Sequence, residues 1–154
     1  MNIEKQKLNI LFLTARFPFP LVGGDRVKPH YLLKYLSKNH NVTLVSFHQG
    51  NNLEEENIKV IENMGIEVHI IKLNPLKAAR NIILKNLFSM PLEIGYYYQP
   101  EFKNKVEQLF NAKKFDLCFA FFMRTAEYIK NKQIPKVLIA EDCRVLYQKR
   151  SYQE

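Results

Sequence analysis

The chain has 154 residues, of which 47% are hydrophobic and 25% are charged, and this balance excludes a disordered protein. The length suits one domain with a core of its own. Lysine and arginine outnumber aspartate and glutamate by 23 to 15, which gives a net charge of +8. Such an excess favours anionic partners, namely phosphorylated ligands, an anionic membrane surface or nucleic acid, although a solvated basic surface explains it equally well.

Two cysteines, Cys118 and Cys143, lie in or beside apolar runs. They show neither the paired spacing nor the clustered histidines of a metal site, so we expect no metal, and reduced thiols in a cytoplasmic protein. The N-terminal apolar run is short and broken early, which predicts neither a signal peptide nor a membrane-spanning helix.

Strands and helices alternate in the first half of the sequence. Apolar runs at 8–14, 41–47 and 66–71 predict buried strands. Between them, apolar residues follow helical spacing from Val27 to Leu36, and 53–65 is an amphipathic helix with early glutamates and a glycine stop signal. This order predicts a parallel sheet with right-handed crossovers.

The second half continues the pattern after a longer helical region at 74–113. Strands are predicted at 115–122 and 136–142, with a short helix at 124–132 between them. A further helix begins at Cys143 and stops without a cap or a closing glycine, so the chain looks truncated. We expect residues 1–154 to form one doubly wound α/β domain.

The stretch "TARFPFPLVGGDR" at 14–26 is the strongest candidate for a site. In an open parallel sheet, ligands bind at the carboxyl ends of the strands, near the switch in strand order, and the first strand usually lies there. Gly23 and Gly24 permit a close backbone approach and a positive φ, and free N–H groups at the next helix start can hold a phosphate. Arg16 and Arg26 can add charge-assisted contacts to phosphate or carboxylate.

The same stretch is also consistent with a plain turn that Pro18 and Pro20 stiffen. Neither GxGxxG nor GxxxxGK[ST] occurs, which excludes a dinucleotide fingerprint and a P-loop. Asp25 is a candidate cap for the next helix. Because Pro29 disfavours helical geometry at Lys28, we expect the regular helix to begin nearer Lys28 than Asp25.

The segment "ILFLTARFPFPLVGGDRVKPHYLLKYLSKNHNVTLVSF" resembles the opening of the family-4 (group 1) glycosyltransferases. The resemblance is strongest over 8–47 and extends over essentially the whole chain. The loop is similar to that of a bacterial subgroup with the pattern R-x-P-x-P-x-x-GG-D-R. Here the pattern is carried by Arg16, Pro18, Pro20, the pair Gly23 and Gly24, Asp25 and Arg26.

This resemblance implies the N-terminal, acceptor-side half of a B-type glycosyltransferase, in which two Rossmann-like domains face each other across a cleft. The C-terminal domain, which mainly binds the donor and carries paired glutamates, would be absent from this chain. The implied reaction moves a sugar from a nucleotide-sugar donor to a cell-envelope glycan or lipid-linked acceptor, with no activity from this half alone. The nucleotide sugar is then a substrate, and no cofactor is implied.

The resemblance also assigns roles to the loop. Gly23 and Gly24 would lie near the donor diphosphate, and Arg16, Asp25 and Arg26 would contact phosphate or acceptor.

Many relatives place a histidine just after the fourth strand, whereas this sequence has Arg124 there, either an acceptor contact or a plain surface arginine. The exit of the fifth strand carries two acids that either line the cleft or cap the following helix, namely Glu141 and Asp142. No general base is assigned.

The middle segment leaves two questions open. Lys77, Arg80 and Lys85 beside apolar residues form a basic amphipathic pattern. Such a helix either lies on an anionic membrane, at the inner face of the plasma membrane, or, as we favour, packs its apolar side on the sheet. The three tyrosines at 96–98 either stack a sugar or belong to the core, and we favour the core.

Two functions other than sugar transfer are a basic binding module and a nucleotide-sugar epimerase. A non-catalytic basic α/β module that binds an anionic membrane or nucleic acid fits the net charge of +8. The sequence lacks an aromatic and basic nucleic-acid motif, so we expect no nucleic-acid partner. A nucleotide-sugar epimerase is disfavoured because both GxGxxG and Tyr-x-x-x-Lys are missing.

Overall fold

A computed structural model of the chain describes residues 6–50, 55–76, 78 and 91–140. Five strands form one parallel sheet in the order β3-β2-β1-β4-β5. They are β1 (Asn9–Thr14), β2 (Asn41–His48), β3 (Glu67–Lys72), β4 (Leu117–Phe121) and β5 (Lys136–Ile139). The predicted α/β class and the parallel sheet are therefore confirmed, and β1 is the central strand.

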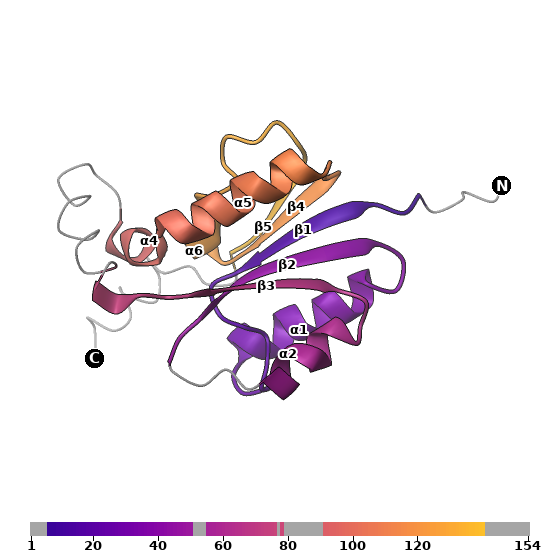
Figure 1. The fold of residues 1–154 in the computed structure, drawn as a ribbon, viewed down its shortest axis with the longest axis horizontal. Coiled ribbons are helices and arrows are strands. Elements are labelled where there is room, and N and C mark those ends of the chain that lie inside the picture. The colour runs from indigo at the N-terminus through magenta and orange to yellow at the C-terminus, as the bar shows by residue number, and fades with distance from the viewer. Residues whose placement is uncertain (1–5, 51–54, 77, 79–90, 141–154) are drawn as a thin grey trace, which may run out of the picture.

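Helices cover both faces of the sheet (Figure 1). One face carries α1 (Gly24–Leu36) and α2 (Glu55–Glu62), and the other carries α4 (Leu92–Tyr97), α5 (Pro100–Ala112) and α6 (Met123–Ala126). The chain thus winds outward from β1 to β3 and then crosses over to β4 and β5. This is a doubly wound, Rossmann-like arrangement.

Alternate residues of the central strands enter two separate cores. On β1, Ile10 and Phe12 face the α1–α2 core with Leu33 and Ile61. Leu11 faces the opposite core, whose other members come from α4, α5 and the turns after α6 as well as from the strands. Because β1 is buried on both faces, its sequence is continuously apolar rather than alternating, as expected for an interior parallel strand.

The first helix begins earlier than the sequence predicts. It starts at Gly24, and the backbone N–H groups of Arg26 and Val27 both donate to the Gly23 carbonyl, at 3.1 and 3.0 Å. Pro29 therefore lies inside the helix, where it lacks an N–H to donate, yet it is buried. The expected start near Lys28 is wrong because tertiary packing of α1 on the sheet outweighs the local cost of the proline.

The short helix predicted at 124–132 is also shorter than expected, since α6 ends at Ala126 and turns follow it.

Several sequence predictions lie outside the described residues: the basic pattern of Lys77, Arg80 and Lys85, the thiol of Cys143, and the acids Glu141 and Asp142. Within the described ranges, no helix is long and apolar enough to cross a membrane.

We predict that Phe102→Ala lowers the free energy of unfolding by about 3–5 kcal/mol, because a buried aromatic ring is lost and a cavity remains. The Phe102 ring is fully buried and lies 4.4 Å, between ring centroids, from both Phe47 and Tyr128. Urea unfolding followed by circular dichroism measures the change. The control Tyr35→Ala, at a helix position that is 65% exposed, should stay within about 0.5 kcal/mol.

Candidate functional site

A cavity of about 170 Å³ opens at the carboxyl ends of β1 and β2. Its lining comes from the loop after β1, the start of α1, the end of β2 and the first turns of α2. The lining residues are Arg16, Phe17, Phe19, Pro20, Arg26, Phe47, His48, Gln49 and Asn57. The cavity lies at the carboxyl edge of the sheet between β1 and β2, whereas the switch in strand order lies between β1 and β4.

The loop between β1 and α1 folds back over the end of the sheet. Phe17 is buried, with 4% of its surface exposed, and packs into the α1–α2 core, with Phe19 against its edge. The Phe19–Pro20 peptide bond is cis, and the Val22 N–H donates to the Pro20 carbonyl at 2.8 Å. Anchored by these aromatic rings, the loop presents its polar residues to the cavity.

Gly23 takes the conformation that the sequence analysis expected of one of the two glycines. Its φ is +85° and its ψ is 149°, a region that residues with a Cβ rarely adopt. A Cβ built at Gly23 would also lie 2.9 Å from Asp25 Oδ1. Gly24 is the first residue of α1, and a Cβ there would meet nothing within 4 Å. The two glycines therefore have different structural roles.

Asp25 does not cap α1, which corrects the sequence prediction. The N-cap residue is Gly23, and no side chain caps the helix. Asp25 Oδ2 instead accepts a hydrogen bond from Arg16 Nη1 at 2.8 Å, in a partly exposed ion pair. As the second residue of α1, Asp25 lies too far along the helix to serve as its N-cap, and the nearby arginine takes its carboxylate.

Two of the predicted arginines meet at the cavity. Arg16 and Arg26 both line it, although ten positions separate them in the sequence. Arg16 reaches the cavity from the loop, held by its ion pair with Asp25, and Arg26 reaches it from the first turn of α1. The arrangement combines two cations with the N-terminal end of a helix, a combination that favours an anion.

His48, the last residue of β2, is a cavity residue that the sequence analysis did not place in the site. Its Nε2 atom is buried, and no described residue offers it a hydrogen-bond partner. Burial lowers the pKa of His48, and the charges of Lys72 and Arg26 lower it further, against a smaller opposing effect of the Gly50 backbone. Lys72 is its cross-strand partner on β3. Burial and the nearby cations therefore favour the neutral imidazole.

Two pairs of polar side chains near the ends of β1 and β2 are joined by hydrogen bonds. Thr14 and Ser46, paired across β1 and β2, are buried, and the Thr14 hydroxyl donates to Ser46 Oγ at 2.8 Å. Gln49 Nε2 donates to the Tyr97 hydroxyl at 2.9 Å, which joins one wall of the cavity to α4. These contacts hold the cavity wall in place, because each donor has a fixed partner.

Arg124 lies in α6, after β4, and is absent from the residues that line the cavity. Its Nε donates to Glu93 Oε1 at 2.5 Å, and its guanidinium lies 5.0 Å from the centre of the Tyr97 ring. Its side chain is only 18% exposed. The structure therefore gives Arg124 a role in joining α6 to α4, and its contact with an acceptor stays a prediction.

Of the three tyrosines at 96–98, only Tyr97 is buried as the favoured core interpretation predicts, and Tyr96 and Tyr98 are half-buried at the edge of the core. Tyr97 is 6% exposed and its ring centroid lies 6.0 Å from that of Phe47. Tyr98 stacks on Tyr128 with ring centroids 5.4 Å apart, and Tyr96 packs against the same core. The Tyr128 hydroxyl in turn donates to the Tyr97 carbonyl and accepts from the Gln99 N–H, at 2.5 and 2.7 Å.

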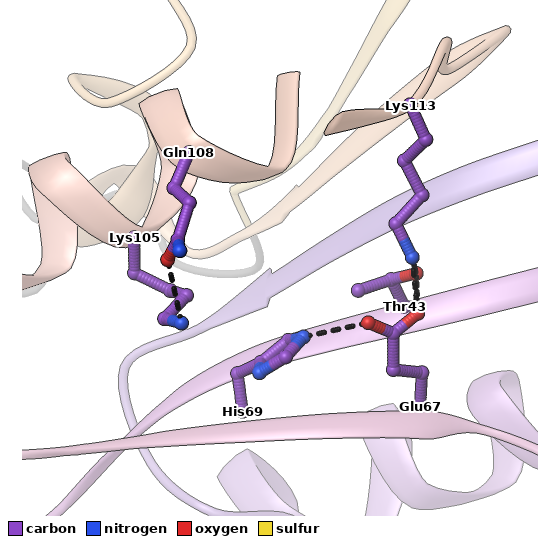
Figure 2. A network of polar contacts seen from close by, with 6 residues as sticks. All are labelled: Thr43, Glu67, His69, Lys105, Gln108 and Lys113. Carbon is purple, nitrogen blue, oxygen red and sulfur yellow. Dashed lines mark hydrogen bonds and ion pairs between the residues drawn. The ribbon is translucent and has the colours of Figure 1, made fainter. Parts of the chain in front are cut away.

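A second polar cluster lies at the opposite, amino-terminal edge of the sheet (Figure 2). Glu67, the first residue of β3, accepts hydrogen bonds from Lys113 and from Thr43, and its other oxygen lies 2.8 Å from His69 Nε2. Burial tends to raise the pKa of Glu67, but Lys113, His69 and Thr43 together lower it. Because Lys113 follows the end of α5, the cluster attaches that helix to the edge strand.

Among the residues that the structure describes, no three His, Cys, Asp or Glu side chains gather as a metal site would require. Cys118 is buried on β4, and burial raises the pKa of its thiol to about 12. Its thiol is therefore not reactive near neutral pH.

Three cavity residues at the end of β2 and on α2 were not predicted from the sequence, namely His48, Gln49 and Asn57. A signal was available for the first two, because they directly follow a predicted strand and so belong to the same sheet edge as the loop. Asn57 gave no signal, since its place depends on how α2 packs beside the loop.

Comparison with known proteins assigns no family. No family model matches the chain, and no curated protein matches it. One similar solved structure is described as a predicted subunit of tRNA methyltransferase from Methanocaldococcus jannaschii. The two chains share 13% identity with a TM-score of 0.43, over 94% of this chain and 76% of the other. A likeness this distant says nothing about what the protein binds.

The two glycines provide a matched test of the loop. We predict that Gly23→Ala lowers the free energy of unfolding by about 1–3 kcal/mol, because alanine must adopt a positive φ and approach Asp25. Gly24→Ala should be neutral or stabilise by up to about 1 kcal/mol, because it adds a good helix former where there is space. Urea unfolding of both variants measures the difference, and equal effects would contradict the described loop conformation.

The Glu67 cluster makes stability depend on pH. Since folding lowers the pKa of Glu67 below its usual 4.5, its stabilisation is present above that pH and is lost as the pH falls through the folded-state pKa. We predict that Glu67→Gln is less stable than the wild type near neutral pH and that the difference disappears in acid. Unfolding free energies between about pH 3 and pH 7 test this. Glu62→Gln, an exposed change on α2, should show no such convergence.

Proposed function

We propose that this domain is the acceptor-side half of a glycosyltransferase that moves a sugar from a nucleotide-sugar donor to a cell-envelope glycan or lipid-linked acceptor. The observation that carries the proposal is the cavity at the exit of the central strand. There the R-x-P-x-P-x-x-GG-D-R loop brings Arg16 and Arg26 together beside the start of α1. The loop pattern is that of the family-4 glycosyltransferases, and its position is that of a ligand loop.

The loop chemistry suits a phosphorylated ligand. Two guanidinium groups provide charge-assisted donors of the kind that recognise phosphate oxygens. The N-terminus of α1 adds to this, since a helix of 13 residues has a full dipole there. Gly23 and Gly24 do not line the cavity, and Gly23 supports the site indirectly because its positive φ turns the chain into α1. These residues bind and orient the substrate, and none of them acts as a general base.

Sugar transfer in this proposal needs a second domain that binds the donor nucleotide, with the nucleotide sugar as a substrate and no cofactor. We place the protein in the cytoplasm, with peripheral contact to the inner face of the plasma membrane, where lipid-linked acceptors are available. Nucleic acid is not a partner in this proposal.

Binding and transfer can be tested separately. For binding, the isotope-labelled chain is titrated with a panel of UDP- and GDP-sugars and followed by NMR. Amide shifts should be confined to the loop at 15–27 and to His48 and Gln49. Arg26→Gln should weaken binding at least about tenfold, because one charge-assisted contact is lost. The matched control Lys34→Gln makes the same charge change elsewhere on α1 and should have no such effect.

For transfer, the chain is assayed alone and together with the polypeptide encoded directly downstream, using labelled nucleotide sugar and lipid-linked acceptors. We expect transfer only in the combined sample. Turnover by this chain alone would contradict the need for a second domain. Salt-sensitive binding to anionic vesicles or nucleic acid, with no nucleotide-sugar binding, would instead favour the basic binding module.

A further inference from the structure

We propose that a second cavity, between α5 and the turns that follow α6, binds a sugar ring that carries a carboxylate, such as a hexuronic acid residue, with the carboxylate at Lys103. The cavity has a volume of about 230 Å³ and shares no lining residue with the cavity at the ends of β1 and β2. The inference therefore goes beyond the proposed function. It rests on that function only for the natural source of the ligand, an acidic residue of a cell-envelope glycan.

Two segments of the chain form the walls of this cavity. One wall comes from α5 and the residues just before it, and the other comes from the turns at 127–132. The cavity is smaller than the roughly 300–1,000 Å³ that is usual for a drug-sized ligand, so it suits a single ring. The lining residues are Tyr98, Lys103, Glu107, Glu127, Tyr128, Lys130, Asn131 and Lys132.

Both walls are held in place by contacts within the protein. Lys132 Nζ donates to Glu107 Oε2 at 2.5 Å, which joins the turns to α5, and it also lies 4.4 Å from the centre of the Phe110 ring. The ammonium group of Lys136, on β5, donates to the carbonyls of Lys130 and Lys132 at 3.0 and 2.5 Å. The cavity is therefore formed before a ligand binds, and little ordering opposes binding.

Part of the lining is aromatic. Tyr98 stacks on Tyr128, with ring centroids 5.4 Å apart and an angle of 5° between the ring planes. Tyr128 is buried, and its hydroxyl is bound to the backbone of Tyr97 and Gln99, so its ring is fixed in place. A flat aromatic surface beside polar groups suits the C–H face of a sugar ring.

The charged part of the lining has one more cation than it has anions. Three lysines and two glutamates line the cavity. Each glutamate has a lysine partner, since Glu107 pairs with Lys132 and Glu127 pairs with Lys130. Lys103 lies one turn of α5 before Glu107, and no described residue pairs with its ammonium group. One cation is thus left for a single negative charge on the ligand.

These charges favour a sugar acid over a neutral sugar or a phosphate. A neutral sugar would leave Lys103 without a counter-charge. A phosphate dianion would bring two negative charges to a space that already holds the carboxylates of Glu107 and Glu127, and like charges repel. A sugar acid brings one negative charge to Lys103. Its hydroxyls can donate to the two glutamates and accept from the amide of Asn131.

Methyl glucuronide is the probe, with methyl glucoside as the matched sugar that lacks the carboxylate. Each is titrated into the isotope-labelled chain at constant ionic strength and followed by NMR. We expect the glucuronide to bind saturably, with a Kd on the order of 1 mM, and to shift amides at 98–107 and 127–132. The glucoside should bind at least about threefold more weakly, because an ion pair is missing. Cyclohexanecarboxylate, which has the charge and a ring but no hydroxyls, should also bind more weakly.

Two lysines of α5 provide matched variants. Lys103→Gln removes the cation at the cavity, so the preference for glucuronide over glucoside should disappear. Lys105→Gln makes the same charge change on the same helix, but Lys105 is absent from the lining and donates to Gln108. The preference should therefore remain in Lys105→Gln. Circular dichroism and urea unfolding confirm that both variants are folded.

Four results would overturn the inference: no saturable glucuronide binding, amide shifts centred on the loop at 15–27, equal binding of the glucoside, or a preference that survives in Lys103→Gln. An equal loss in Lys105→Gln would indicate diffuse charge and would also overturn it. Cyclohexanecarboxylate binding as tightly as the glucuronide would reject a sugar ligand.

This test involves neither a nucleotide nor a second domain. Glucuronide binding in this cavity without sugar transfer would therefore reject the proposed function alone. Transfer without glucuronide binding would reject this inference alone.

Discussion

Burial of β1 on both faces is the constraint on which the rest of the structure depends. The strand lies between β2 and β4, with Phe12 in one core and Leu11 and Leu13 in the other. Each such side chain contributes about 1.5–3 kcal/mol when it is removed from water, so no other register of this strand competes. Because β1 is central, the loop that leaves it lies in the middle of the carboxyl edge of the sheet.

The cavity follows from that position and from the pairing of β1 with β2. The register brings Thr14 opposite Ser46, so both strands end at the same level and their exits share one space. The aromatic residues of the loop pack down on the α1–α2 core, and Gly23 then turns the chain directly into α1. As a result, Arg26 lies near His48, a residue that belongs to another strand.

The two ends of the sheet use charge in different ways. At the amino-terminal edge, Glu67 is surrounded by Lys113, His69 and Thr43, and the cluster is satisfied internally (Figure 2). At the carboxyl edge, Arg26 and Lys72 lie near His48. The buried Nε2 atom of His48 has no hydrogen-bond partner among the described residues. Internal satisfaction of the Glu67 cluster indicates a structural role.

Much of the fold was predictable from the sequence because it depends on local patterns. The apolar runs predict the five strands, and the position of the glycine pair after the first strand predicts a loop at the ligand edge. Two local expectations were wrong: Asp25 as a helix cap, and a helix start near Lys28. Both fail for the same reason, because contacts with distant residues outweigh the preferences of neighbours in sequence.

What the sequence by itself determined is therefore the class of fold, the buried strands and the loop with its two arginines. Only the tertiary structure decided which strand ends share a cavity, that Asp25 pairs with Arg16, and that Arg124 joins α6 to α4. It also brought His48 beside Arg26. The physical reason is that these pairings depend on strand order and helix packing, which bring together residues that no local spacing relates.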